Sequence, residues 1–192
     1  MCNLYTQSKS VDEIAALFRS QQMPLVFPEG VPNLQPKDIA ITDPGPVVRA
    51  GGDAQYEMIV RRWSWPDAGG RPVYNFRSEG REFNSGRCLI VADGFYEYTA
   101  PADPGRKRKD RWLFTMPGED WFAIAGIVRD HPGVGEAFTM LTAAPGPDVA
   151  PYHGRQVVVL TRAQWPLWLD LRIPAGDVLA PSPAGTLAVE PA

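Results

Sequence analysis

Cysteine and histidine are scarce in this sequence: its 192 residues include two of each, Cys2, Cys88, His131 and His153. Two cysteines cannot form the framework of several disulfides that stabilises small secreted domains, and a reducing compartment keeps both as thiols. There is no Cys-x-x-Cys pair, and a structural zinc site usually needs four Cys or His ligands at characteristic spacing. We therefore expect neither a metal ion nor a bound cofactor.

Long apolar runs and an excess of positive charge are also lacking. No run approaches the ~18 residues that a membrane helix needs, and the N-terminus is polar too early for a secretory signal. We expect a cytoplasmic protein with no membrane partner. The net charge of −3 argues against a general nucleic-acid coat but leaves local binding open. The basic run Arg106–Lys109, flanked by Pro104 and Gly105 and followed by Arg111, is interpreted as a solvated loop.

The 20 prolines and 18 glycines predict many short elements joined by turns. Ser10 and Glu13 form a capping box, and apolar residues at helical spacing predict a helix over 11–19. Residues 24–46 are expected to be irregular. Thr161 and Gln164 could cap a last helix that bears Trp165, Trp168 and Leu169. Seven short apolar stretches predict strands: Pro46–Ala50, Glu57–Trp63, Cys88–Ala92, Trp112–Met116, Trp121–Val128, Ala137–Thr142 and Val157–Leu160. The fold class is therefore α+β: one domain over 1–192 with a β-rich, barrel-like, mostly antiparallel core and a few flanking helices.

Cys2 is the first residue with chemical content. Removal of Met1 would leave its α-amine free beside its thiol, with pKa values of ~7.7–8.0 and ~8.5 in unperturbed groups. Such a 1,2-aminothiol condenses with an aldehyde to an imine, and the thiol then closes a five-membered thiazolidine ring. The alternative is that Cys2 occupies this position by chance, so other residues must support the chemistry.

Three further segments place polar residues beside predicted strands, and they contain Asn75, Glu97 and His153. Each has an ordinary structural explanation: a turn asparagine, a surface carboxylate and a loop histidine. Glu97 is the most informative, because Phe95, Tyr96 and Tyr98 surround it. A carboxyl group among aromatic rings tends to be desolvated, which raises its pKa and suits a proton donor.

The order of these segments resembles the SOS-response-associated peptidase family, whose members process abasic sites in DNA. Members begin Met-Cys and carry characteristic segments in a fixed order along the whole chain. The matching segments here are Met1-Cys2, Pro32–Pro36, Arg62–Pro66, Asn75–Glu79, Asp93–Tyr98 and His153–Gln156.

The resemblance implies that the protein senses abasic sites in single-stranded DNA as a monomer, nucleoid-associated when bound to damaged DNA. Cys2 would form a covalent thiazolidine crosslink after Met1 removal, shielding the lesion during the SOS response. Asn75, Glu97 and His153 take the family's other active-site positions. Lyase activity and autocatalytic removal of Met1 are possible accompanying activities. The DNA-binding positions implied by the resemblance are Arg62, Trp63, Trp65, Arg77 and Arg155.

Departures from the family pattern and two alternatives remain. Asn3-Leu4 replaces the commoner Gly-Arg, Ser64 stands where glycine is usual, and Gln156 follows the arginine in place of another residue. These differences affect DNA affinity and strand preference more than Cys2 chemistry. The first alternative is a thiol peptidase that uses Cys2, His153 and Asn75. The second is a non-catalytic single-stranded DNA-binding module.

Overall fold

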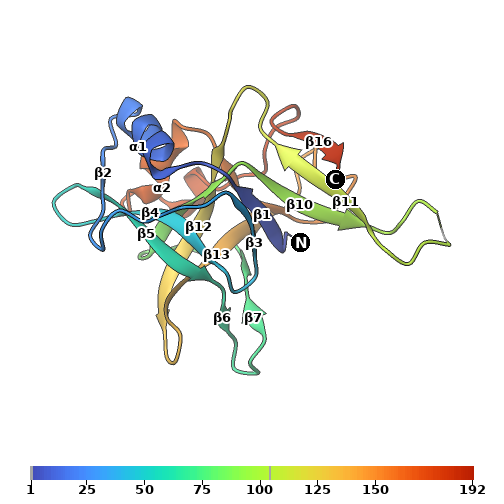
Figure 1. Ribbon diagram of the computed structural model, residues 1–192, viewed down its shortest axis with the longest axis horizontal. Helices are drawn as coiled ribbons and strands as arrows, with labels where there is room; N and C mark the ends of the chain where they lie inside the picture. Colours follow the sequence, from blue (N-terminus) through green and yellow to red (C-terminus); the bar gives the residue numbers. More distant parts are fainter. Residues whose placement is uncertain (1, 104) are drawn as a thin grey trace.

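Five strands close into a barrel at the centre of the protein (Figure 1). The computed structural model describes residues 2–103 and 105–192. Neighbouring strands around the barrel are antiparallel except at its closure, where β13 pairs in parallel with β5 and Phe138 lies opposite Trp63. The predicted β-rich α+β fold is confirmed, with a mixed barrel as its core. The barrel strands are β4 (Pro44–Ala50), β5 (Tyr56–Trp63), β9 (Arg87–Ala92), β12 (Phe122–His131) and β13 (Gly135–Ala143).

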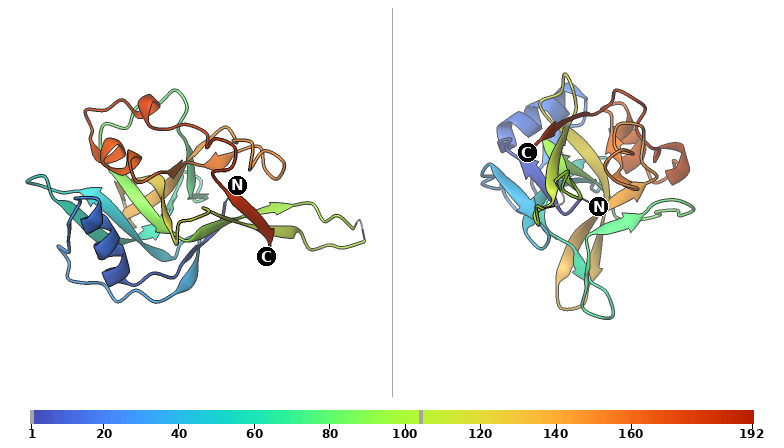
Figure 2. Two further views of the ribbon diagram at one scale, coloured as in Figure 1. Left: turned by 90° about the horizontal axis from the view of Figure 1, so that it is seen from above. Right: turned by 90° about the vertical axis from the view of Figure 1, so that its right-hand side faces the viewer.

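A second sheet of five strands lies beside the barrel and includes the N-terminal strand (Figure 2). Its order is β16-β11-β10-β1-β3, and all its pairings are antiparallel. The strand β1 is therefore internal, paired on both sides. The strands are β16 (Ala188–Pro191), β11 (Asp110–Thr115), β10 (Gly94–Thr99), β1 (Leu4–Gln7) and β3 (Lys37–Ala40).

The smaller elements confirm some predictions and correct others. The helix α1 (Val11–Ser20) begins at the predicted capping box of Ser10 and Glu13. Residues 24–46 are not wholly irregular, because they contain β2 (Leu25–Val26) and β3 and the start of β4. Such short edge pairings have no clear sequence signal in a proline-rich segment. The remaining elements are β6 (Trp65–Pro66), β7 (Pro72–Val73), β8 (Asn75–Arg77), β14 (Gln156–Val157), β15 (Val159–Leu160), α2 (Gln164–Leu169) and a 3₁₀ turn (Ala175–Asp177).

The two helices pack together against the barrel through aromatic rings. Phe18 of α1 stacks on Trp165 of α2 with ring centroids 4.9 Å apart, and Trp165 stacks on Trp121 at 5.3 Å. These contacts bury the apolar face that each helix would otherwise expose. Across the part of the chain that the structure describes, no helix is long and apolar enough to cross a membrane.

Ser64 marks the point where the chain leaves the barrel. Its backbone has φ of 86°, in the left-handed region that favours glycine, and its amide donates to Phe138 O at 2.7 Å. The chain then forms the β6–β7 hairpin and returns to β13 as β8, with Asn75 opposite Met140. The left-handed turn thus explains why glycine is usual at this position, and serine adopts it at a cost in strain.

Replacing Ser64 with glycine should therefore stabilise the protein. Glycine relieves the left-handed strain, and the buried Ser64 hydroxyl has no hydrogen-bond partner among residues 2–103 and 105–192. We expect Ser64→Gly to raise the free energy of unfolding in urea by about 1 kcal/mol. Ser78→Gly is the matched control and should lower it, because Ser78 donates to Thr142 O at 2.9 Å. A loss of stability in Ser64→Gly would contradict the assignment of strain.

Candidate functional site

The pairing of β1 with β10 brings Cys2 to Glu97. Tyr5 lies opposite Phe95 and Thr6 opposite Gly94, so the same antiparallel register places the residues before β1 beside Glu97. Asp93 holds β1 in this position: its Oδ2 accepts from the Ser8 amide and from Thr6 Oγ1.

Glycine is required next to Asp93 because the strands approach closely. A Cβ atom on Gly94 would lie 2.9 Å from Phe114 O and 2.7 Å from Leu113 Cδ1. The Asp-Gly pair that precedes Glu97 therefore positions two strands at once: Asp93 fixes β1, and Gly94 admits β11.

Asn75 fixes the backbone of Cys2 from the opposite side. Its Nδ2 donates to Cys2 O at 2.7 Å, across 73 positions of sequence. Asn75 is itself fixed by the parallel pairing of β8 with β13. The Cys2 side chain is buried, 1% exposed, and its Sγ donates to Leu4 O at 3.3 Å. Cys2 is therefore held by backbone, amide and thiol contacts together.

Glu97 is a buried carboxyl group, 1% exposed, on β10. Burial raises the pKa of Glu97, while the nearby His153 and a hydrogen bond from the Cys2 backbone counter part of that rise. The backbone nitrogen of Cys2 is thus within hydrogen-bonding reach of this carboxyl group. A group of this kind can hold a proton at a pH where an exposed glutamate has lost it.

The Cys2 thiol is not activated in this environment. Burial, followed by the charge of Glu97, raises the pKa of the Cys2 thiol well above its usual range. The resting site therefore holds a neutral thiol beside a backbone nitrogen and a buried carboxyl group whose pKa is raised. This arrangement favours chemistry that starts at nitrogen and uses sulfur later.

His153 is positioned by the loop before β14. Its backbone amide donates to Val149 O at 3.0 Å, and its Nδ1 lies 3.0 Å from Arg155 N and 2.9 Å from Arg155 O. When Nδ1 accepts from the Arg155 amide, the Nε2 atom carries the proton. A positive charge on the nearby His153 lowers the pKa of Glu97 and so opposes part of the effect of burial.

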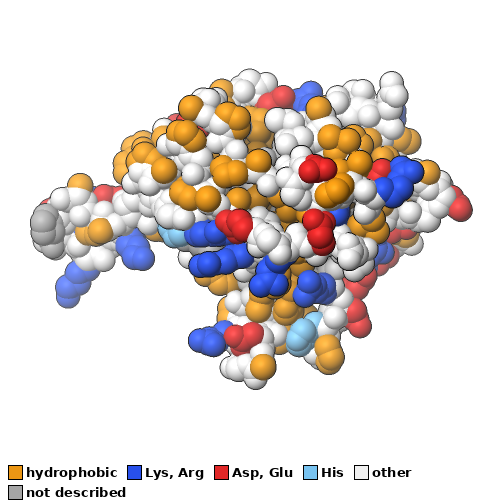
Figure 3. Space-filling view, turned by 180° about the vertical axis from the view of Figure 1, so that it is seen from behind, with side chains coloured by type: hydrophobic (Ala, Val, Ile, Leu, Met, Phe, Trp, Pro, Cys, Tyr) orange, Lys and Arg blue, Asp and Glu red, His pale blue; other side chains and the backbone are white. Residues whose placement is uncertain are grey.

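The predicted DNA-binding arginines differ in how they are placed. Arg62 and Arg77 are exposed, and a band of basic side chains crosses the face seen in Figure 3. Arg155 instead forms a bidentate pair with Glu79, at 2.5 and 2.8 Å, and donates to Thr142 O. A phosphate bound by Arg155 would have to displace Glu79, so its predicted role requires a rearrangement.

Trp63 and Trp65 do not have faces available for stacking on bases. Trp63 is 0% exposed, stacks on Phe138 inside the barrel, and donates from Nε1 to Tyr74 O at 2.9 Å. Trp65 is 7% exposed and packs in the core. Both side chains are buried and offer no exposed ring face, and a role of the Trp63–Pro66 segment in DNA binding stays a prediction.

Two aromatic residues at the site were not singled out from the sequence. Trp112 lies opposite Glu97 in the β10–β11 register, and Tyr152 packs against it with ring centroids 4.8 Å apart. Both are half-buried. The position of Tyr152 directly before His153 was a signal for it, whereas Trp112 becomes visible only once the strand register is known.

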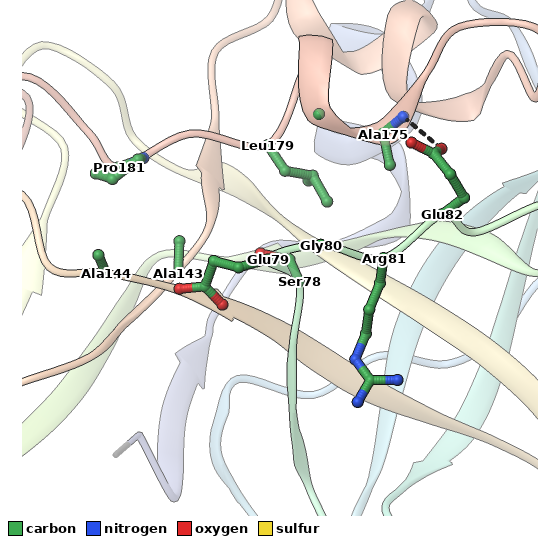
Figure 4. A pocket seen from close by; sticks show the side chains of 11 residues that line it. Ser78, Glu79, Gly80, Arg81, Glu82, Ala143, Ala144, Ala175, Leu179 and Pro181 are labelled. Carbon is green, nitrogen blue, oxygen red and sulfur yellow. Dashed lines mark hydrogen bonds between the residues drawn. The ribbon is translucent and has the colours of Figure 1, made fainter.

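A hollow of about 300 Å³ lies beside Glu79, at the turn that follows β8 (Figure 4). Its lining includes Glu79 and Glu82, and Glu82 accepts from the Ala175 amide at 2.9 Å. The Glu79 carboxylate forms an ion pair with Arg155. Because both carboxylates are engaged and neither Cys2 nor Glu97 lines the hollow, we do not assign it to the site. No cluster of metal-ligating side chains occurs within 2–103 and 105–192.

Solved structures with similar folds were found, each below 25% identity. A protein from Bordetella bronchiseptica aligns with a TM-score of 0.73 and 23% identity over 100% of this chain and 99% of its own. A phage-related protein from the same organism gives 0.75 and 19%, over 100% and 94%. A protein from Bacteroides thetaiotaomicron gives 0.72 and 14%, over 99% and 91%. No curated protein matches the chain.

The fold and the site define a β-barrel protein with a cysteine held beside a buried carboxyl group at its N-terminal strand. The sequence matches the family described as SOS response associated peptidase (SRAP) over residues 1–191. The chain belongs to that family, which places it among proteins associated with the response to DNA damage.

The burial of Cys2 predicts that its thiol reacts slowly with alkylating reagents. In a Cys88→Ala background, alkylation of Cys2 by iodoacetamide at pH 8 should be at least about tenfold slower in the folded chain than in urea, because little thiolate is present. Asn75→Ala should speed the reaction by releasing the Cys2 carbonyl, whereas Asn3→Ala, at an exposed neighbour, should leave it unchanged. A folded protein that reacts as fast as the unfolded chain would contradict the assigned burial.

Proposed function

We propose that this protein captures abasic sites in single-stranded DNA through a covalent bond to Cys2, shielding the lesion during the response to DNA damage. One observation carries the proposal. The Cys2 backbone nitrogen, which becomes the α-amine when Met1 is removed, is within hydrogen-bonding reach of the buried carboxyl group of Glu97. Membership of the SRAP family supports the DNA-damage role.

The chemistry begins with hydrolysis of the Met1–Cys2 peptide bond, which consumes one water and frees the α-amine. Asn75 keeps the Cys2 carbonyl in place during this change, because its Nδ2 contact does not involve the nitrogen. A free α-amine has a pKa of ~7.7–8.0, so part of it is neutral and nucleophilic near pH 7. Self-processing by Glu97 or His153 is one source of this cleavage.

The abasic sugar exists mainly as a closed hemiacetal, which must open before an aldehyde is available. Glu97 in its protonated form donates to the ring oxygen as the ring opens. The amine then attacks C1′, and loss of one water gives an imine; His153 moves the protons. The thiol adds to the imine carbon, its proton passes to nitrogen, and the thiazolidine ring closes. The net change is one new C–N bond, one new C–S bond and one released water.

The raised pKa values fit this order of steps. A neutral, buried thiol does not compete with the amine for the aldehyde, and it becomes the nucleophile only after the imine has formed beside it. The same imine could lose the 3′-phosphate by β-elimination, a lyase side reaction that thiazolidine closure suppresses. A thiol peptidase would need the reverse order, with a thiolate prepared in advance.

Variants of the two central residues separate the steps. Cys2→Ser keeps the amine and loses the thiol, so it should form an imine that cyanoborohydride traps but no stable crosslink on a denaturing gel. Glu97→Gln should slow crosslinking by about 10²- to 10⁴-fold. Cys88→Ala should crosslink like the wild type. Stable crosslinking by Cys2→Ser or Cys2→Ala would overturn the proposal.

The Glu97→Gln variant also carries its own folding control. Burial raises the pKa of Glu97 in the folded wild type above the ~4.3 of the unfolded chain. Between these two pKa values the folded protein keeps a proton that the unfolded chain releases. The free energy of unfolding therefore falls as the pH rises from the unfolded to the folded pKa. The glutamine variant lacks this loss. It should be at least as stable as the wild type in urea at pH 8, which separates slow chemistry from misfolding.

A further inference from the structure

The segment that joins β10 to β11 projects from the body of the protein (Figures 1 and 2). We call residues 100–103 and 105–109 the basic arm. Its four consecutive cations, Arg106–Lys109, are all exposed, as the sequence led us to expect. Figure 3 shows basic side chains on this projection, although the whole chain has a net charge of −3. The basic arm is therefore a positively charged segment on a protein whose net charge is negative.

The two carboxylates nearest the cations are used inside the arm. Asp110 Oδ2 accepts from the Ala102 amide at 2.9 Å, and its Oδ1 pairs with Arg106 at 3.0 Å. Asp103 Oδ1 accepts from the Gly105 amide at 2.8 Å. Lys107, Arg108 and Lys109 form no ion pair with any residue that the structure describes. Their positive charge remains available to a ligand.

The arm is continuous with the site through β11. Trp112 lies opposite Glu97, and its Nε1 donates to Thr99 Oγ1 at 2.9 Å where the arm begins. A groove of about 390 Å³ runs beside the arm. It is lined by the cations Arg106, Arg108, Lys109 and Arg111, by Asp110 and Trp112, and by the C-terminal Pro191 and Ala192. An aromatic side chain followed by cations is the combination that binds single-stranded nucleic acid.

The length of the arm gives its reach. β11 begins at Asp110 and rises about 3.3 Å per residue, so its first residue lies about 7 Å from Trp112 along the strand, and the cations of 106–109 lie beyond that end. The cations would then meet phosphates several nucleotides away from the residue held at Cys2.

We propose that the basic arm, with Trp112 at its base, binds the phosphates of the single-stranded DNA that leaves the site on one side of the abasic residue. This inference rests on the proposed function and adds to it a flank-binding surface. It predicts that the arm increases the rate of capture only on substrates long enough on that side to reach it.

The test uses full-length protein and oligonucleotides with one abasic site. The flank is about three or about twelve nucleotides long, on either the 5′ or the 3′ side. Neutralising three cations in Lys107→Gln/Arg108→Gln/Lys109→Gln should slow second-order crosslinking at 0.1 M salt by about 10- to 100-fold on the substrate with the long flank on one side. The slope of log rate against log salt should fall by about 2 on that substrate. Substrates with the short flank on that side should react as with the wild type.

The matched control is Lys9→Gln/Arg19→Gln/Lys37→Gln, which makes the same change in net charge away from the arm. It should retain the wild-type dependence on flank length. Equal losses in both triple variants, equal losses on short and long flanks, or no loss at all would each overturn the inference.

Two negative outcomes can be told apart: that the basic arm does not bind DNA, and that the protein does not capture abasic sites. If the wild type forms no crosslink on any substrate, the proposed function fails. DNA binding by the basic arm is then measured by fluorescence anisotropy, with the same oligonucleotides lacking the abasic site. A lower salt slope in the arm variant alone would support the arm, and unchanged binding would overturn it.

Discussion

The pairing of β1 on both its edges is the constraint on which the site depends. A chain terminus is ordinarily free to fray, but here β1 lies between β10 and β3 and is tied to Asp93. That placement carries Cys2 into the interior, where Asn75 holds its carbonyl at 2.7 Å and its thiol is buried. The unusual pKa values of Cys2 and Glu97 follow from this burial. Loosening β1 would therefore change the position of Cys2 and the pKa values of Cys2 and Glu97 together.

The surroundings of Cys2 favour amine chemistry over thiol peptidase chemistry. In a cysteine–histidine–asparagine site, the asparagine orients the histidine and the histidine activates the thiol. Here Asn75 donates to the Cys2 backbone, and His153 Nδ1 contacts the backbone of Arg155. The thiol pKa is raised by burial. The Cys2 thiol is therefore not activated as a nucleophile, whereas the Cys2 nitrogen lies beside the Glu97 carboxyl group.

The sequence allowed the main elements to be predicted wherever a residue carried its own signal. The capping box of Ser10 and Glu13, the buried strand around Cys88 and the desolvation of Glu97 were all readable. Short pairings such as β3 and β8 were not, because they exist only through distant partners. Distant partners also determine the burial of Trp63 and Trp65, which lie in a segment predicted to bind DNA but pack in the core. The Arg155–Glu79 pair and the Trp112–Tyr152 contact also require the three-dimensional register.

Covalent capture depends on a reactive amine at Cys2, and the intact mass of the protein measures this directly. The protein is weighed before and after incubation with a single-stranded oligonucleotide that carries one abasic site. Capture through Cys2 requires a starting mass without Met1 and a stable gain equal to the mass of the oligonucleotide minus one water. A retained Met1 together with the full gain would show that the bond forms elsewhere. An unprocessed chain with unchanged mass, or a processed chain that gains nothing, would contradict covalent capture and favour reversible binding.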